Sequence, residues 1–165
     1  MQHEFESSNT SGISESNRYL IFSLGTELYG SPLQLIREVL KNGEVKEVPY
    51  MKTYFKGVIN VRGKIISVLD LREKFGLKID VETTEMMLVI EKDGHYLATI
   101  VDEVLAVGTI EEGSVDRNPT LSTKIPLDFF LGIGQWKNRL VNLIDIGGVM
   151  SKEDFSTISR TKEVA

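Results

Sequence analysis

The sequence predicts an all-β fold, made mainly of strands with a few short helices. Short runs rich in Val, Ile, Leu and Tyr follow one another from Tyr19 onward, which is typical of strands. Glycine-containing dipeptides separate these runs, and such dipeptides favour tight turns. Long helical periodicity is missing from the sequence. A small barrel or sandwich is therefore the expected architecture.

Turn chemistry predicts three hairpins. A strand-like run precedes each of three two-residue turns, Gly25-Thr26, Gly63-Lys64 and Asp93-Gly94. Glycine at the first position suits a type II′ turn, whereas Asp-Gly suits type I′. Short helices are expected after residues that commonly cap a helix, namely Ser31 and Asp70.

A weak internal repeat indicates that the molecule has two related halves. Phe55-Lys56-Gly57-Val58 recurs as Phe130-Leu131-Gly132-Ile133, and in both copies Asp follows the Gly at the same interval, as Asp70 and Asp145. Glu38-Val39-Leu40 is echoed by Glu103-Val104-Leu105 at a shorter offset, which predicts an insertion around Gly113 to Ile125. Each half would be a small barrel or curled sheet of about five strands, too small to bury much alone. We therefore expect an apolar seam between the halves.

The expected organisation has three parts. Residues 1–17 are rich in Ser and predict a disordered tail. Residues 18–150 would form a single domain of two intertwined halves. Residues 151–165 would form a helix that begins after Ser151 and docks on the body, followed by a tail.

Composition excludes several classes of function. With 24 acidic and 19 basic residues, the net charge is −5, the wrong sign for nucleic acid or for anionic lipid. The absence of Cys excludes disulfides and thiolate chemistry. The longest apolar run, Met86 to Ile90, is far too short to span a membrane, and no signal peptide is evident. We expect a cytoplasmic protein without direct membrane insertion.

The sequence offers little support for catalysis. The chain has two His residues, His3 and His95, which cannot build a triad or a typical metal site. Asp70 and Asp145 stand where a capped turn begins, so capping explains them better than acid–base catalysis. Neither a cofactor nor a metal is expected. A binding module is favoured, and a small β-barrel hydrolase is the weaker alternative, which a deep pocket joining acidic residues to His95 would support.

The predicted hairpin at residues 57–72 separates two faces. With Gly63-Lys64 as the turn, Arg62 would pair with Ile65, and Asn60 with Ser67. One face would be wholly apolar and form core: Ile59, Val61, Ile66 and Val68. The other would hold Asn60, Arg62, Ile65 and Ser67. Such a mixture occurs both at interface centres and on ordinary surfaces, and these residues alone leave the two readings open.

This hairpin resembles the signature of the CheW family of chemotaxis coupling proteins, roughly G-x-x-N-x-R-G-x-x-x-P-x-x-D-L-R. The matching residues are Gly57, Asn60, Arg62, Gly63, Asp70, Leu71 and Arg72. The resemblance spans nearly the whole chain that is expected to be ordered. It implies two SH3-like β-barrels of about five strands each, packed about a shared hydrophobic core. It also implies a non-catalytic scaffold in bacterial chemotaxis arrays.

The resemblance further implies partners and a site. The partners would be the cytoplasmic tip of a chemoreceptor and the regulatory domain of a CheA-type histidine kinase, at membrane-associated receptor arrays. The receptor-binding groove corresponds here to Ile36, Glu38, Gly57, Asn60 and Arg62, to which we add Val58 as an apolar contact. An adaptor for another chemosensory pathway, serving motility or gene control, is the alternative within the family.

Two departures from the family pattern bear on receptor preference. Ser67 stands where the family usually has Pro, and Ser31-Pro32 replaces an apolar and acidic pair. The first removes a rigid residue from the expected outer face, and the second could reshape the groove near Ile36. The fold should tolerate both.

Overall fold

The computed structural model describes residues 17–41, 43–49, 52–79, 85–120, 125 and 127–149. Strands dominate this part of the chain. They are β1 (Arg18–Leu24), β2 (Glu27–Pro32), β3 (Ile36–Lys41), β4 (Phe55–Val61), β5 (Lys64–Asp70), β6 (Met86–Lys92), β7 (His95–Val101), β8 (Glu103–Thr109), β9 (Phe130–Trp136) and β10 (Arg139–Ile144). The helices are short: α1 (Leu71–Lys74) and the 3-10 helices η2 (Leu33–Leu35), η3 (Glu112–Ser114), η4 (Leu127–Phe129) and η5 (Ile146–Val149).

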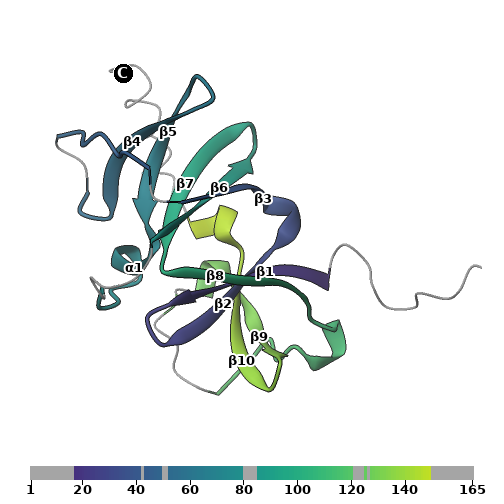
Figure 1. The fold of residues 1–165 in the computed structure, drawn as a ribbon. Coiled ribbons are helices and arrows are strands. Elements are labelled where there is room, and N and C mark those ends of the chain that lie inside the picture. The colour runs from purple at the N-terminus through teal and green to yellow at the C-terminus, as the bar shows by residue number, and fades with distance from the viewer. Residues whose placement is uncertain are drawn as a thin grey trace, which may run out of the picture.

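The strands form two sheets of five, which lie next to one another in Figure 1. One sheet has the order β3-β6-β7-β5-β4 and is called barrel 1. The other has the order β8-β1-β2-β10-β9 and is called barrel 2. The chain therefore starts in barrel 2, passes through η2 into barrel 1, and returns at Asp102, between β7 and β8. This confirms the all-β prediction of two five-stranded units.

The two barrels repeat the same pairing pattern. Within barrel 1, β4 and β5 are antiparallel and β5 runs parallel to β7. In barrel 2, correspondingly, β9 and β10 are antiparallel and β10 runs parallel to β2. A bulge follows Phe55 in β4, and another follows Phe130 at the same point in β9. The internal repeat therefore marks structurally equivalent hairpins.

The second repeated segment is equivalent at the level of strands but not of residues. β3 and β8 hold the same place in their sheets. The bulge of β3 falls at Arg37 and that of β8 at Leu105, so Glu38 does not correspond to Glu103. The longer connection from β8 to β9 carries η3 and η4, in agreement with the predicted insertion.

Three apolar clusters stabilise the fold, and the largest is the expected seam. This central cluster draws on both sheets, including Phe22 and Tyr29 of barrel 2 and Leu69 and Phe75 of barrel 1. The rings of Phe22, Tyr29, Phe75 and Phe129 stack in sequence, with adjacent centroids 5.4 to 6.1 Å apart. Each barrel also has a smaller core of its own. Each sheet therefore contributes side chains both to the central cluster and to the smaller core of its own barrel.

Two of the three predicted hairpin turns are confirmed, and the third is wrong. Gly25-Thr26 joins β1 to β2, and Asp93-Gly94 joins β6 to β7. Between β4 and β5, however, the turn is Arg62-Gly63 rather than Gly63-Lys64. Both of its central residues have positive φ, 52° and 81°, which is the signature of a type I′ turn.

The predicted pairing of this hairpin is consequently displaced by two residues. Ile59 pairs with Ile66 rather than with Val68, and Asn60 with Ile65 rather than with Ser67. Because side chains alternate with a period of two, this shift leaves every residue on its predicted face. Ile59, Ile66 and Val68 are accordingly buried in the core of barrel 1. Ser67 is only 2% exposed, because the far end of the other face turns toward the central cluster.

The predicted caps have mixed outcomes. Asp70 caps α1 as expected, since its carboxylate accepts the Arg72 N–H. Ser31 does not cap a helix: it pairs with Leu20 inside β2, and η2 begins after Pro32 without a side-chain cap. The predicted tail over residues 1–17, apart from Asn17, and the predicted helix after Ser151 lie outside the described residues.

Candidate partner-binding site

Arg62 occupies the tip of the β4–β5 hairpin of barrel 1. Its φ of 52° is a left-handed conformation that non-glycine residues seldom adopt, and the following Gly63 completes the turn. The side chain is 81% exposed, so the guanidinium faces solvent as the sequence predicted. A type I′ turn matches the twist of its strands, and it therefore presents Arg62 from a defined backbone position.

Glu38 of β3 is the ion-pair partner of this arginine. The Arg62 Nη2 lies 3.0 Å from the Glu38 Oε1. β3 and β4 are opposite edges of the sheet in barrel 1, so the pair connects the two edges. An exposed ion pair of this kind contributes about 0–1 kcal/mol to folding. Arg62 can therefore exchange Glu38 for another carboxylate at little cost.

Asn60 supports the turn that carries Arg62. Its Oδ1 accepts a hydrogen bond of 2.9 Å from the Gly63 N–H, and its side chain is exposed. Directly across the hairpin lies Ile65, which is 38% exposed. A large apolar side chain thus stands beside the polar tip, a combination that occurs both at interface centres and on ordinary surfaces.

Gly57 and Val58 lie on the side of β4 that contacts the preceding loop. Val58 exchanges two backbone hydrogen bonds with Lys46, of 2.8 and 2.9 Å. A Cβ atom on Gly57 would lie 2.0 Å from the Lys46 carbonyl oxygen, and its φ is 137°. The close approach of Lys46 therefore requires glycine here. The Val58 side chain is buried.

Ile36 begins β3 and is half-buried, with its side chain packed against the central cluster. Arg37, at the bulge, points to another strand and forms an ion pair of 2.8 Å with Glu91 of β6. The predicted site residues are thus distributed over β3, β4 and one turn. The structure brings Arg62 and Glu38 into contact, and Asn60 contacts the turn that carries Arg62. Ile36 is half-buried and Val58 is buried.

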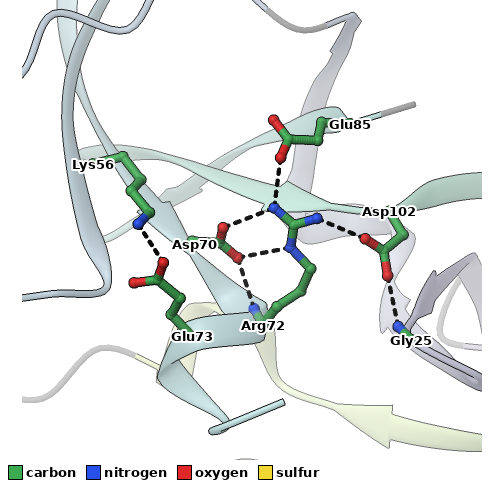
Figure 2. A network of polar contacts seen from close by, with 7 residues as sticks. All are labelled: Gly25, Lys56, Asp70, Arg72, Glu73, Glu85 and Asp102. Atoms are coloured by element: carbon green, nitrogen blue, oxygen red, sulfur yellow. Dashed lines mark hydrogen bonds and ion pairs between the residues drawn. The ribbon is translucent and has the colours of Figure 1, made fainter. Parts of the chain in front are cut away.

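Sequence reasoning missed the role of Arg72. This arginine matched the family signature but received no function, and its guanidinium binds three carboxylates in the interior (Figure 2). The misplaced turn had a usable signal: the repeat aligns Arg62-Gly63 with Lys137-Asn138, and Asn favours positive φ. Lys137 and Asn138 indeed have φ of 46° and 60°.

The described residues show little that suits other kinds of site. They hold no cluster of three or more potential metal ligands. A cleft of about 330 Å³ lies in barrel 2, and its lining includes Asp116 of the β8–β9 connection, Gln135 and Leu140. His95 is exposed beside the β6–β7 turn of barrel 1 and does not line this cleft. Within the same part of the chain, no helix is long and apolar enough to cross a membrane.

These features define a two-barrel β protein with an exposed arginine at the tip of one hairpin. Residues 18–154 match the family model described as the CheW-like domain, and the chain belongs to this family.

Named relatives and a solved structure agree with this assignment. The chain is 25% identical over 152 residues to the chemotaxis protein CheW of Klebsiella aerogenes, with 92% of each chain covered. It is 29% identical to that of Helicobacter pylori, with 82% of each covered. It is also similar to the crystal structure of the scaffolding protein TtCheW from Thermoanaerobacter tengcongensis, with 29% identity and a TM-score of 0.76, over 84% of this chain and 95% of that one.

Proposed function

We propose that this protein is a non-catalytic chemotaxis scaffold that couples the cytoplasmic tips of chemoreceptors to the regulatory domain of a CheA-type histidine kinase, in the cytoplasm at receptor arrays. Family membership and the chemotaxis and scaffolding names of its relatives support this role. The structural observation that carries it is the exposed Arg62 guanidinium in the two-residue turn at the tip of the β4–β5 hairpin.

Arg62 would recognise a carboxylate of the partner. Its contact with Glu38 uses Nη2, and the high exposure leaves other faces of the guanidinium accessible to solvent. Guanidinium–carboxylate hydrogen bonds are directional and stronger than those between neutral groups. Because the turn fixes the backbone at Arg62, little backbone freedom is lost when a partner binds, and the cost of ordering is confined to the side chain.

Apolar contacts would complete the docking face. Ile65 is the exposed apolar neighbour of this tip, while Ile36 and Val58 lie deeper and would contribute chiefly to the shape of the surface. A receptor helix that lays its apolar side against Ile65 could place an acidic residue at Arg62. Gly57 would act indirectly, by allowing the loop segment at Lys46 to pack against β4.

A three-component reconstitution tests the proposal. The immobilised cytoplasmic fragment of a receptor from the same genome is incubated with the matching CheA-type kinase, with and without this protein. We expect the receptor to retain the kinase only when the protein is present. Retention of the kinase that is independent of the protein, or no retention at all, would contradict the proposal.

A further inference from the structure

The interior of the molecule contains a charged cluster centred on Arg72, whose side chain is 1% exposed. Its Nε and Nη2 donate to the two carboxylate oxygens of Asp70, over 3.0 and 2.8 Å. Nη2 also donates to Glu85, and Nη1 donates to Asp102 over 2.7 Å. Figure 2 shows the guanidinium between these carboxylates. Burial lowers the pKa of Arg72, but the three carboxylates outweigh it and raise the pKa above its usual range.

Barrel 2 shows that helix capping does not require this arginine. Asp145 follows β10 as Asp70 ends β5, and its Oδ1 accepts the N–H groups of Gly147 and Gly148 over 3.1 and 3.2 Å. In the repeat, Gly147 stands where barrel 1 has Arg72. The cap thus forms in barrel 2 without a guanidinium, so another reason must explain a buried charge in barrel 1.

The contact of Arg72 with Asp102 has no counterpart at Gly147, and it connects Arg72 to barrel 2. Asp102 lies at the crossover from β7 of barrel 1 to β8 of barrel 2. Its Oδ2 accepts a 2.6 Å hydrogen bond from the N–H of Gly25, in the β1–β2 turn of barrel 2. Its own N–H donates to the Ser23 carbonyl. Arg72 therefore links the base of the β4–β5 hairpin, through Asp102, to a turn of barrel 2.

The base of this hairpin is held on its other side as well. Lys56 of β4 forms an ion pair with Glu73 of α1 (Figure 2). The short helix α1 is thereby attached both to β4 and, through Arg72, to the crossover.

We propose that Arg72 is a positioning residue that clamps the crossover at Asp102 and so holds the two barrels at one relative orientation. Apolar contact is non-directional, and the central cluster alone would tolerate small changes in the angle between the sheets. Guanidinium–carboxylate bonds have fixed geometry and define one arrangement. A buried ion pair often contributes little net stability, because desolvation offsets the attraction, and in some proteins it specifies one conformation instead.

The experiment measures the distance between one labelled point on each barrel, which changes when their relative orientation changes. Because the chain has no Cys, Lys64→Cys and Arg139→Cys introduce two unique sites for spin labels, one beside the tip turn of each barrel. Pulsed electron paramagnetic resonance then gives the distribution of distances between them. Asp102→Ala removes the link between Arg72 and Gly25, while Arg72 keeps Asp70 and Glu85. We expect a clearly broader or shifted distribution.

Hydrogen exchange supplies the second readout. In Asp102→Ala we expect the Gly25 amide to exchange faster by a factor on the order of a hundred. The amides of Val68 and Leu143, in the separate cores of the two barrels, should keep their protection. Asp145→Ala, which removes the cap that has no arginine, is the matched control and should leave the distance distribution unchanged.

The proposal would be overturned by an unchanged distance distribution in Asp102→Ala, or by equal broadening in Asp145→Ala. It would also be overturned if Asp102→Ala lost amide protection in both barrel cores, because the cluster would then be a source of global stability. If Asp102→Ala does not fold, Asp102→Asn serves in its place. It keeps an acceptor for Gly25 but loses the charge that faces Arg72, and it should broaden the distribution to a smaller extent. An unchanged distribution in that variant would also overturn the proposal.

Discussion

The two barrels have the same backbone plan but different side chains at the point where each sheet closes. In both, a two-residue turn with positive φ joins the last two strands of the sheet, and a short loop segment pairs with the first of them, at Lys46 in barrel 1 and at Asp116 in barrel 2. Barrel 1 connects its edges with the exposed Glu38–Arg62 pair. Barrel 2 instead packs Trp136 of β9 against Gly108 of β8.

This difference separates what maintains the fold from what is available for function. The Lys137 Nζ, at the position of Arg62, lies 4.8 Å from the centre of the Trp136 ring, a cation–π contact within its own barrel. Arg62 instead holds an exposed and weak ion pair. The shared features therefore specify the fold, and the divergent tip of barrel 1 is the better candidate for a partner.

The largest expected effect concerns the glycine that follows the bulge in each barrel. A Cβ at Gly57 would lie 2.0 Å from the Lys46 oxygen, whereas one at Gly132 would lie 2.8 Å from the Asp116 oxygen, and both residues have positive φ. We expect Gly57→Ala to lower the free energy of unfolding by about 3 to 5 kcal/mol and Gly132→Ala by about 1 to 3 kcal/mol. Urea denaturation followed by circular dichroism measures both. If Gly57→Ala lowered the free energy of unfolding by less than Gly132→Ala, the close approach of Lys46 to Gly57 would not be the main constraint.

A smaller effect is expected where the sheets close. Trp136 and Val61 are each the last residue before the tip turn, and each packs on the core of its barrel. Trp136→Ala should cost about 2 to 3 kcal/mol, and Val61→Ala about 1 to 2 kcal/mol, since less apolar surface is lost. The same denaturation experiment compares them. If the two variants lost equal free energy of unfolding, the packing of the Trp136 indole would not be the main contact that closes the sheet of barrel 2.

A still smaller effect depends on pH. Burial raises the pKa of Tyr29 above its ordinary 10.0. The nearby Glu27 carboxylate, which accepts a hydrogen bond from the Tyr29 hydroxyl, raises this pKa further. The neutral phenol therefore stabilises the fold below pH 10 and loses this contribution as the pH rises through the folded pKa. In Tyr29→Phe we expect about 1 kcal/mol less stability at pH 7 and a shallower loss above pH 10. Thermal unfolding from pH 7 to 11 checks this; an unchanged alkaline slope would assign the loss to other groups.

Most of the fold was predicted from two features of the sequence, the internal repeat and the local turn chemistry. Asp-Gly and Gly-Thr turns identified two hairpins, and the recurrence around Gly57 and Gly132 identified the two barrels. The hairpin register could not be fixed from the alternation of side chains, because a shift by two residues preserves both faces. Arg62 with positive φ was also unexpected, since that region strongly favours glycine.

Tertiary contacts account for the remaining differences. Ser67 was assigned to an exposed face, but it is buried in the folded protein. Ser31 resembled a helix cap, but its pairing with β1 continues the strand through it. The partners of Arg72 include Glu85 and Asp102, which are distant along the sequence, and no local pattern connects them. The exposure of Arg62 was predicted, because it follows from its position near a polar turn.

The most direct test of the proposed docking face compares the two equivalent tips. Arg62→Glu and Lys137→Glu make the same change of charge in the two barrels, and binding of the receptor cytoplasmic fragment is measured for each by calorimetry, together with the melting temperature. We expect Arg62→Glu to weaken binding by about tenfold or more, with little change in melting temperature, and Lys137→Glu to change it by less than about twofold. Equal losses for the two variants, or a loss in Arg62→Glu that is matched by unfolding, would show that Arg62 does not carry the docking.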